Sequence, residues 1–350
     1  MITPEEKYMH RAVELARLGA GRVSPNPMVG AVIVHHDKII GEGFHQEYGK
    51  AHAEVNAVNS VFAAFADAEA RLKESVIYVT LEPCSHYGKT PPCADLIIRH
   101  GIPKVVIGSP DPFDQVNGKG IQQLRNAGIT VEENVLRKEC DFLNRRFFTR
   151  LKKQRPYIIL KWAETADHFF APNNGSQQWI SSAAARILTH RWRAEEDAIL
   201  VGKNTALIDN PQLNVREWRG RNPKRIVIDR HLALPPGLHL FDQSQQTIIF
   251  NSVKTETHNA VKYLELEDFD RYLPQMIAYQ LYIMDIQSII VEGGAKTLDL
   301  FIKANLWDEA RIFTGPQYWG EGIPAPQITG NVKDDLRVGP DRLRTVFREY

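Results

Sequence analysis

The chain has 350 residues, of which 43% are hydrophobic and 24% are charged, with 43 basic side chains, 42 acidic side chains and three cysteines. This composition is typical of a globular protein and excludes disordered, collagenous and disulfide-rich classes. The net charge of +1 gives no strongly basic surface that would favour a nucleic acid or an anionic membrane. At roughly 100–200 residues per domain, we expect two domains.

The N-terminus carries charge where a signal peptide would need an apolar run, over residues 5–11. No stretch reaches the roughly 18 uninterrupted apolar residues of a membrane span. Three cysteines in so long a chain are typical of free thiols or metal ligands in a reducing compartment. We therefore expect a cytoplasmic protein with no membrane or nucleic-acid partner.

The first half of the chain alternates between helical and extended patterns. Apolar residues recur with a helical period over 4–18, and the apolar run 29–34 predicts a buried strand that turns into a second strand over 39–44. The elements expected after it are helix 53–65, strand 76–81, helix 93–100, strand 105–107 and helix 120–126. This order predicts an α/β domain.

A cluster of six basic residues lies between positions 145 and 155, just before Pro156. Such short charge runs are usually the exposed face of a helix rather than a nucleic-acid site. We place the domain boundary there, which gives domains over 1–146 and 147–350. The second domain is expected to be α/β as well, with strand 158–160, helix 182–194, strands 198–201, 226–228 and 247–250, helix 270–283, strand 288–291 and a C-terminal strand over 343–348.

Three potential zinc ligands stand out in the first domain. His52 opens a predicted helix, Cys84 follows a predicted strand, and Cys93 opens another helix. One imidazole and two thiolates suit zinc, and three protein ligands leave the fourth tetrahedral position open for a catalytic water. Glu54 is near enough to His52 in sequence to move a proton from that water to a departing amine. The pattern resembles the signature of zinc nucleobase deaminases, although Cys93 lies nine positions after Cys84 instead of three.

Other interpretations of these residues stay open. Taken singly, each cysteine could be a buried apolar residue and His52 a hydrogen-bonded core histidine. His86 could supply a fourth ligand, which would close the site and make the zinc structural. Cys140 has no ligand partner nearby in the sequence, so we expect a structural thiol.

Four stretches of this domain resemble the bifunctional deaminase/reductase family of bacterial riboflavin biosynthesis: 24–32, 41–45, 52–57 and 80–93. In that family a long loop between the two cysteines is the normal form. The resemblance implies a cytidine-deaminase-like three-layer α/β/α fold and one Zn²⁺ per deaminase site. It also implies that Asn26 contacts the pyrimidine, whereas an Asn between two prolines is, taken by itself, more often a turn former.

The second domain resembles the reductase domain of the same family, which has a dihydrofolate-reductase-like α/β fold and uses NADPH. The matching stretches are 160–163, 178–181, 193–194, 197–202, 209–213, 225–229 and 292–294, together with Thr205 and Arg216. No Gly-x-Gly-x-x-Gly motif follows a predicted strand, so a Rossmann site is unsupported. A strand instead runs through Gly293-Gly294 into a helix, where backbone N–H groups can hold a phosphate, although an ordinary turn would look the same.

The resemblance divides residues of this domain between two ligands. Those implied to border the nicotinamide cofactor are Ala163, Trp179, Thr205, Asp209, Gly294, Ala295, Lys296, Thr297, Leu298, Asp299 and Leu300. Those implied to border the substrate are Gln177, Arg193, Leu213, Arg216 and Glu292. Arginines such as Arg193 and Arg216 bind phosphate with paired donors, but either could instead form a surface salt bridge. Lys161, Asp209 and Glu292 are the candidates for the acid or polar relay in hydride transfer, and the sequence does not rank them.

Two positions depart from the usual pattern of this family. The segment 165–168, Thr-Ala-Asp-His, stands where the family has Ser-x-Asp-Gly, so His168 occupies a turn position that can require a positive φ. Gln177 stands where a smaller hydroxyl side chain is frequent. We expect these departures to affect the loop on the cofactor side more than the reaction.

The expected function is therefore bifunctional. Zinc hydroxide would hydrolyse the 2-amino group of 2,5-diamino-6-ribosylamino-4(3H)-pyrimidinone 5′-phosphate, and NADPH would then reduce the ribosyl group to ribityl. The preference for NADPH and assembly as a homodimer or tetramer are implied by the resemblance alone. Two alternatives remain: a zinc deaminase whose C-terminal half is a non-catalytic ligand-binding module, and an RNA or DNA base deaminase, against which the near-neutral charge argues.

Overall fold

The computed structural model describes residues 3–85, 91–112, 118–174, 176 and 178–349. The chain divides into two compact units, Met1–Lys153 (unit 1) and Gln154–Tyr350 (unit 2). The division follows helix α7 (Arg145–Lys153), whereas the sequence analysis places the boundary at 146/147. The basic segment is thus mostly a helix of unit 1.

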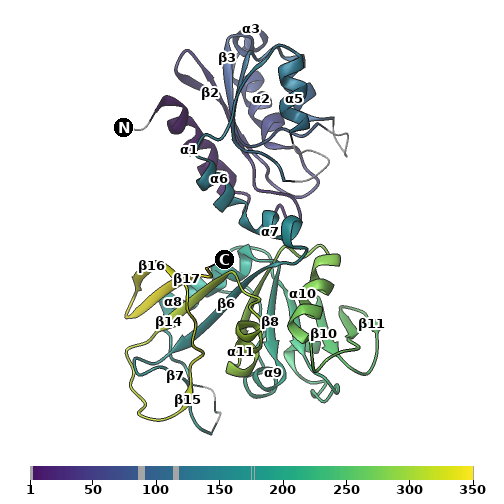
Figure 1. The fold of residues 1–350 in the computed structure, drawn as a ribbon, viewed down its shortest axis with the longest axis vertical. Coiled ribbons are helices and arrows are strands. Elements are labelled where there is room, and N and C mark those ends of the chain that lie inside the picture. The colour runs from purple at the N-terminus through teal and green to yellow at the C-terminus, as the bar shows by residue number, and fades with distance from the viewer. Residues whose placement is uncertain (1–2, 86–90, 113–117, 175, 177, 350) are drawn as a thin grey trace. The chain divides into compact units, whose positions relative to one another are not determined.

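Unit 1 is built on a five-stranded sheet with the order β2-β1-β3-β4-β5 (Figure 1). The strands are β1 (Gly30–His35), β2 (Lys38–Phe44), β3 (Ser75–Leu81), β4 (Lys104–Ser109) and β5 (Thr130–Glu132). β1 runs antiparallel to β2 and β3, and β3, β4 and β5 are parallel. The carboxyl end of β3, which leads to Cys84, therefore lies at the same edge as the end of β4.

Helices cover both faces of this sheet. The helices of unit 1 are α1 (Pro4–Arg17), α2 (Ala53–Ala64), α3 (Ala68–Leu72), α4 (Cys93–Arg99), α5 (Lys119–Asn126), α6 (Arg137–Leu143) and α7, and α7 packs against α6. α1 and α6 share one core with Val32, Tyr78 and Val106. α2, α4 and α5 share another with the alternate strand residues Ile33, Ile77 and Ile107. Successive strand residues face opposite sides, so the predicted three-layer α/β/α arrangement is confirmed.

Local sequence explains how the first elements form and pack. Thr3 caps α1 by accepting a hydrogen bond from the Glu6 N–H at 3.1 Å, and the Glu6 carboxylate accepts from the Thr3 N–H at 2.9 Å. This reciprocal capping box satisfies two N–H groups that the helix leaves unpaired. α2 lies so close to β2 that a Cβ on Gly43 would be 2.3 Å from the backbone nitrogen of Ala57. Glycine at this position therefore sets the distance between the two elements that flank His52.

Unit 2 contains a ten-stranded sheet with the order β11-β12-β10-β9-β8-β13-β6-β14-β17-β16. The strands are β6 (Tyr157–Glu164), β8 (Ala198–Gly202), β9 (Lys224–Ile228), β10 (Thr247–Asn251), β11 (Glu256–His258), β12 (Val261–Glu265), β13 (Ser288–Gly293), β14 (Glu309–Thr314), β16 (Asn331–Val338) and β17 (Asp341–Phe347). β7 (Phe169–Ala171) and β15 (Ile323–Pro324) form a separate pair. Every pairing from β12 through to β14 is parallel, and ligands typically bind outside the carboxyl ends of such strands.

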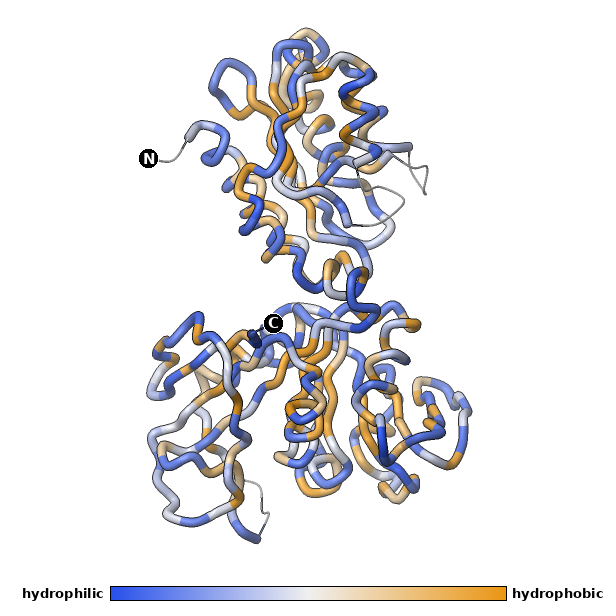
Figure 2. The backbone as a smooth tube through the Cα atoms, in the orientation of Figure 1, coloured by the Kyte–Doolittle hydropathy of each residue, from blue (hydrophilic) through white to orange (hydrophobic). Residues whose placement is uncertain are grey.

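The helices of unit 2 are α8 (Ala183–Glu195), α9 (Lys203–Asp209), α10 (Leu273–Ile283) and α11 (Ala295–Lys303), with a 3₁₀ helix, η1 (His239–Phe241). Ile277 of α10 and Leu298 of α11 pack on Leu160 and other residues of one sheet face. Trp192 of α8 packs on Ile159, from the opposite face of β6. Figure 2 shows the hydrophobic colour concentrated on the strands between these layers. The predicted α/β class of the second domain is confirmed.

Two strands of unit 2, β14 and β16, have no clear signal in the sequence. β14 carries Glu309 and Arg311, which are buried and pair with each other at 2.6 Å, so its apolar pattern is broken by charges. β16 is exposed along almost its whole length, so it shows no alternation of polar and apolar residues.

No helix among the described residues is long and apolar enough to cross a membrane.

A fully buried arginine fixes the loop that follows β9. The guanidinium of Arg225 donates hydrogen bonds to Oγ1 of Thr247 at 2.9 Å, to the carbonyls of His239 and Gln245 at 2.6 and 3.0 Å, and to the carboxylate of Asp242 at 2.8 Å. Its side chain has no exposed area. Removing one member of such a network leaves the other buried polar groups without partners.

We expect Arg225→Met to lower the free energy of unfolding of unit 2 by about 3 kcal/mol, because the buried groups that accept hydrogen bonds from the guanidinium would lose their donor. All six tryptophans of the chain lie in unit 2, so tryptophan fluorescence during urea unfolding reports on this unit. Arg230→Met is the matched control, because Arg230 pairs with Asp270 at the surface, where such a pair contributes about 1 kcal/mol or less. Equal losses in the two variants would contradict the structural role of Arg225.

Candidate active sites

Unit 1 brings the three predicted zinc ligands together. His52 immediately precedes α2, Cys84 follows β3, and Cys93 is the first residue of α4. His52 Nδ1 lies 3.6 Å from Cys84 Sγ and 3.3 Å from Cys93 Sγ, and all three ligand atoms lie within 4.8 Å of one another. Tetrahedral zinc with ordinary Zn–N and Zn–S bonds would hold such atoms about 3.6 Å apart. The three side chains therefore fit one zinc ion.

Hydrogen bonds within this cluster favour a thiolate. The bond from the Cys93 side chain, followed by that from His52, lowers the pKa of Cys84 to about 4 against the opposing effect of burial. The backbone N–H of Cys93 also donates to Cys84 Sγ at 3.3 Å. An ionised thiolate is the form that binds a metal, so the site is prepared for a cation. His86, the alternative fourth ligand, lies outside the described residues.

Glu54 lies in the first turn of α2, next to the ligand cluster. Its side chain is buried and forms a hydrogen bond with Cys93. Burial raises the pKa of the Glu54 carboxyl above its ordinary value, although the nearby His52 opposes that shift. A carboxyl group with a raised pKa can accept and return a proton near neutral pH. Glu54 therefore has the position and the environment of a general acid and base.

Asn26 is held by a histidine that sequence reasoning did not single out. His45 Nδ1 lies 3.1 Å from the carbonyl oxygen of Ala51, and its Nε2 lies 3.1 Å from Asn26 Nδ2. A carbonyl can only accept, so Nδ1 carries the proton of a neutral ring and Nε2 accepts from the Asn26 amide. Burial lowers the pKa of His45, which favours the neutral ring. This arrangement leaves Asn26 Oδ1 as the acceptor that a ligand could use.

Asn144 holds the same loop from the other side. Its Oδ1 accepts from the Met28 N–H at 2.8 Å, and its Nδ2 donates to the Met28 carbonyl at 2.9 Å. Asn144 is buried, so this paired contact fixes the backbone two residues after Asn26. The sequence gives no signal that Asn144 fixes this loop, because the contact joins residues that are 116 positions apart.

Glu82 anchors the loop that carries Cys84. Its buried carboxylate accepts hydrogen bonds from the backbone N–H groups of Asp111, Gly118, Gly120 and Ile121 at 3.0–3.3 Å. One donor, Asp111, lies just after β4, and the other three belong to the N-cap and first turn of α5. The only hint in the sequence is a carboxylate at the end of an apolar strand, two residues before Cys84. Glu82 therefore positions the zinc ligand by tying its loop to a second element.

We expect Glu82→Gln to weaken zinc binding by about tenfold or more, because residues that orient ligands contribute to metal affinity on that scale. The amide nitrogen of glutamine cannot accept hydrogen bonds, and its N–H groups would face the backbone N–H donors that now bind the carboxylate. Competition with a chromophoric chelator measures the affinity, and Co²⁺–thiolate absorption reports on the geometry of Cys84. Glu42→Gln is the matched control, because its carboxylate pairs with Arg11 at the partly exposed surface. Unchanged zinc affinity in Glu82→Gln would contradict this role.

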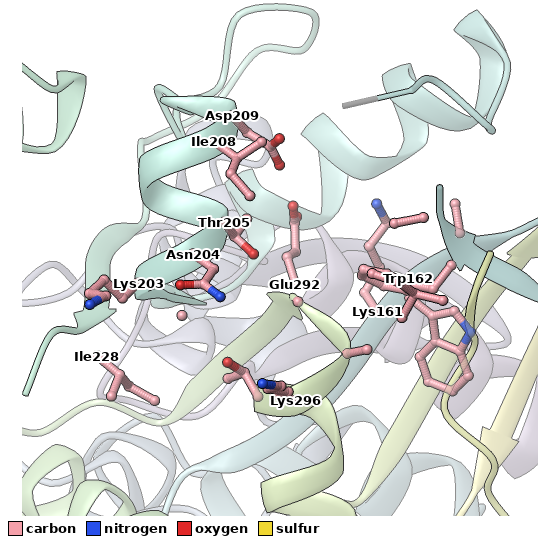
Figure 3. Close-up of a pocket in the computed structure, with 18 of the residues that line it drawn as sticks. Lys161, Trp162, Lys203, Asn204, Thr205, Ile208, Asp209, Ile228, Glu292 and Lys296 are labelled. Carbon is pink, nitrogen blue, oxygen red and sulfur yellow. The ribbon is translucent and has the colours of Figure 1, made fainter. Parts of the chain in front are cut away.

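Unit 2 contains a cavity of about 630 Å³ at the carboxyl ends of β6, β8, β9 and β13. This is the size and place expected for a small-molecule site in an α/β sheet. Figure 3 shows Glu292, from the end of β13, with Thr205 and Asp209 of α9 on one side and Lys161 of β6 on the other. The N-terminal end of α11, which begins after Gly294, also lines the cavity.

Most residues predicted for the cofactor and the hydride relay line this cavity. They are Lys161, Ala163, Trp179, Thr205, Asp209, Glu292, Gly294, Ala295, Lys296, Thr297 and Leu300. Leu298 and Asp299 do not line it, and Leu298 instead packs in the core of the sheet. The reason is the helical period of α11, which directs part of any continuous segment away from the cavity. Gln177 lies outside the described residues.

The three candidates for the relay differ in their electrostatic environment. Burial alone would raise the pKa of Glu292, but Arg193 and then Lys161 outweigh it and hold the pKa at about 2. Burial lowers the pKa of Lys161, although Glu292 opposes that shift. Burial raises the pKa of Asp209. At neutral pH Glu292 is therefore a fixed anion, whereas the ammonium of Lys161 can release a proton more readily than an exposed lysine.

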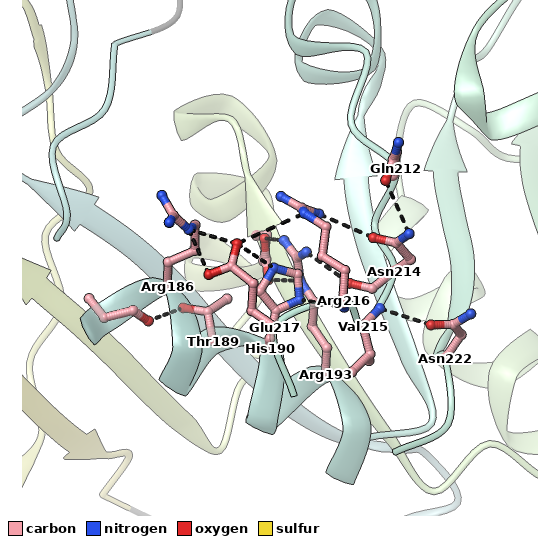
Figure 4. Close-up of polar contacts among 12 residues, drawn as sticks. Arg186, Thr189, His190, Arg193, Gln212, Asn214, Val215, Arg216, Glu217 and Asn222 are labelled. Atoms are coloured by element: carbon pink, nitrogen blue, oxygen red, sulfur yellow. Dashed lines mark hydrogen bonds and ion pairs between the residues drawn. The ribbon is translucent and has the colours of Figure 1, made fainter. Parts of the chain in front are cut away.

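The two arginines predicted to bind substrate phosphate do not line the cavity, and only Arg193 contacts Glu292. Arg193 donates to both oxygens of Glu292 at 3.0 and 2.7 Å, and both side chains are almost buried. Arg216 is 44% exposed and donates to Oδ1 of Asn214 at 3.1 Å (Figure 4). Leu213, the third predicted neighbour of the substrate in this segment, is buried. Arg216 is thus the more available guanidinium, because the charge of Arg193 is already compensated.

His190 and Glu217 complete this cluster, and neither has a signal in the sequence. Figure 4 shows them between Arg186 and Arg216. Burial, followed by the charges of Arg193 and Arg216, lowers the pKa of His190 to about 4, so the ring is neutral. Its Nδ1 accepts from the backbone N–H of Arg216 at 3.4 Å. Both carboxylate oxygens of Glu217 accept from the one Nε–H of Arg186, at 2.8 and 2.9 Å.

His168, which stands where the family pattern has glycine, adopts the backbone conformation expected of that glycine. His168 has a φ of 63°, in the left-handed region that glycine adopts most easily. Its N–H donates to the Thr165 carbonyl at 2.9 Å, and its Nδ1 lies 2.9 Å from a carboxylate oxygen of Glu164. The turn is therefore formed by a histidine whose side chain is held by a neighbouring carboxylate.

Comparison with known proteins gives matches along the whole chain. Residues 2–109 match the cytidine and deoxycytidylate deaminase zinc-binding region, and residues 156–346 match the RibD C-terminal domain. The chain is 40% identical to the riboflavin biosynthesis protein RibD of Aquifex aeolicus, over 98% of this chain and 96% of that protein. It is 36% identical to RibD of Escherichia coli K12, over 96% and 97% of the two chains.

Solved structures agree with these matches. One from Thermotoga maritima, described as a diaminohydroxyphosphoribosylaminopyrimidine deaminase/5-amino-6-(5-phosphoribosylamino)uracil reductase, is 37% identical, with a TM-score of 0.90 over 99% of both chains. Acinetobacter baumannii RibD is 31% identical, with a TM-score of 0.90 over 100% of both chains. The predicted deaminase-like and reductase domains are confirmed. The chain therefore belongs to the RibD family of bifunctional deaminase/reductases in riboflavin biosynthesis.

Proposed function

We propose that unit 1 removes the 2-amino group of 2,5-diamino-6-ribosylamino-4(3H)-pyrimidinone 5′-phosphate as ammonia, and that unit 2 then reduces the ribosyl group to ribityl with NADPH. The observation that carries this proposal is the presence of two separate constellations. Unit 1 groups His52, Cys84 and Cys93 next to the buried carboxyl of Glu54, and unit 2 places Lys161 beside Glu292 in a cavity.

The deaminase half of the proposal rests on Glu54 and Asn26. Zinc, when bound by the three ligands, supplies a water that ionises near neutral pH. Glu54 accepts a proton at its carboxylate and donates one to the departing amine, for which its raised pKa suits it. Asn26 presents Oδ1 to an N–H group of the pyrimidine, because His45 already uses the amide nitrogen. His45 and Asn144 act on this step only through the position of Asn26.

The reductase half of the proposal assigns different tasks to the three candidates. The N-terminal end of α11 and the exposed ring of Trp179 would hold NADPH, which would supply the hydride. Lys161 donates a proton to the oxygen or nitrogen of the substrate where negative charge develops. Glu292 cannot donate near neutral pH, because Arg193 and Lys161 keep it ionised, so it orients these two cations. Arg216 binds the phosphate of the substrate, and Asp209 borders the cofactor.

We also propose that the protein acts in the cytoplasm as a homodimer or tetramer assembled through unit 2. The three free cysteines support a reducing compartment. The edge strand β16 exposes Val332 and Leu336, each 55% accessible, and an exposed apolar edge is typical of a surface that pairs with another chain. Membership of the RibD family argues against both alternatives, the nucleic-acid deaminase and the non-catalytic C-terminal module.

We expect Glu54→Ala to abolish ammonia release while it retains zinc and still reduces the deaminated intermediate. Lys161→Met should have the opposite effect: it should lower NADPH consumption by about 10²-fold or more, on the scale of general-acid catalysis, and spare ammonia release. Ammonia release, NADPH absorbance and zinc content measure the three properties separately. If either variant lost both activities while it stayed folded, two independent sites would be ruled out.

The ion pair of Glu292 predicts a pH dependence of stability. Its pKa of about 2 lies below its ordinary value of 4.5, so the stabilisation is complete above pH 4.5 and is lost as the pH falls from 4.5 towards 2. The free energy of unfolding of unit 2 in the wild type should exceed that in Glu292→Gln by at most about 3 kcal/mol at neutral pH. Tryptophan fluorescence in urea at several pH values measures this difference, which should shrink on acidification. A difference that stays constant down to pH 2 would contradict the assignment.

A further inference from the structure

A second group of potential metal ligands lies in unit 1, away from the cysteines. His35 ends β1, His36 lies in the turn between β1 and β2, and Glu74 immediately precedes β3. β1 and β3 are antiparallel, with His35 opposite Ser75, so the pairing register brings Glu74 next to the two histidines. Cys84 follows the other end of β3, and the seven residues of that strand span about 23 Å.

The three side chains converge on one carboxylate oxygen. His35 Nε2 lies 3.4 Å from Glu74 Oε2, and His36 Nε2 lies 3.5 Å from the same atom. All three ligand atoms lie within 4.8 Å of one another. A tetrahedral ion with bonds of 2.0–2.2 Å to nitrogen and oxygen would hold such atoms about 3.4 Å apart. One ion could therefore bind all three groups without a large rearrangement.

The backbone prepares this geometry before any ion binds. The side chain of His35 is only 14% exposed, so its neighbours restrict its rotamer. His36 and Asp37 have φ values of 46° and 60°, and the carbonyl of Asp37 accepts a hydrogen bond from the Tyr8 hydroxyl at 2.8 Å. The turn is thus tied to α1, and two ligands project from fixed backbone positions. Pre-organised ligands lose less conformational entropy on binding.

We propose that His35, His36 and Glu74 form a second metal site, for zinc or another divalent transition ion such as nickel or copper. Two imidazoles and one carboxylate suit these ions, whereas calcium and magnesium prefer oxygen ligands alone. The ion would join the β1–β2 turn to the start of β3 and would stabilise this corner of unit 1. Its role is structural, because none of the residues proposed for deamination belongs to this group.

The test uses the full-length protein loaded with one zinc per chain and dialysed against increasing Ni²⁺. Counting both metals should give one additional nickel per chain with the zinc retained. His36→Gln and Glu74→Gln should each weaken nickel binding by at least about tenfold, on the scale by which lost ligand interactions reduce metal affinity. Both variants should keep the wild-type rate of ammonia release. Copper, used as a spectroscopic probe, should show coupling to two imidazole nitrogens in the wild type and to one in His36→Gln.

The matched control is His100→Gln. His100 Nδ1 lies 3.2 Å from a carboxylate oxygen of Glu69 in the same unit, but the structure describes no third potential ligand grouped with this pair. This variant should bind nickel as the wild type does. The proposal would be overturned by the absence of saturable nickel binding, by nickel binding that survives both His36→Gln and Glu74→Gln, or by nickel uptake that occurs only with release of zinc.

Discussion

Buried carboxylates at the ends of central parallel strands hold both active sites in place. A carboxylate removed from water is unfavourable unless hydrogen bonds or cations surround it. Glu82 meets this requirement with four backbone N–H groups, from Asp111 after β4 and from the start of α5. Glu292 meets it with Arg193 and Lys161. In each unit the need to satisfy one buried charge therefore determines where a strand end, a loop and a functional side chain lie.

The two sites apply this constraint to different chemistry. In unit 1 the carboxylate of Glu82 accepts from backbone N–H groups among the described residues, so its effect is to position the loop of Cys84 beside His52 and Cys93. In unit 2 the carboxylate of Glu292 pairs with Arg193 and is close enough to Lys161 for their charges to affect each other. In the proposed function the first site needs close spacing of three metal ligands, whereas the second needs a lysine with an altered proton affinity. Both properties depend on burial as much as on residue type.

A second set of contacts comes from residues that have no direct role in the proposed reactions and that orient residues which do. His45 determines which atom of the Asn26 amide is free, and Asn144 fixes the backbone at Met28. In unit 2 the neutral His190 and the carboxylate of Glu217 separate the guanidinium groups around Arg216. Without such contacts, like charges or a rotated amide would leave a ligand with the wrong partner. These supporting residues come from segments far apart in the chain.

Local pattern was enough to predict most of the buried strands, most of the helices and the three candidate zinc ligands that the structure groups together. The apolar runs of β1, β3, β8 and β13 have the length and composition of central strands. His52, Cys84 and Cys93 carry a signal because few other functions need an imidazole and two thiols beside helix starts and strand ends. By contrast, β14 contains buried charges and β16 is exposed, so neither follows a hydrophobic period. Leu298 shows a different limit of sequence analysis. The continuous segment 294–300 was assigned to the cofactor, but a helix presents only one face to a cavity, and Leu298 lies in the core.

The sequence by itself determined the two-part α/β organisation, the metal-binding residue types and the family of the enzyme. Only the tertiary structure decided that Glu292 is a fixed anion, that Lys161 has a lowered pKa, and that His35 and His36 share a carboxylate with Glu74. The physical reason is that residue type and periodicity are local properties of a chain. Burial, charge pairing and proton affinity depend instead on neighbours that folding brings together from distant positions.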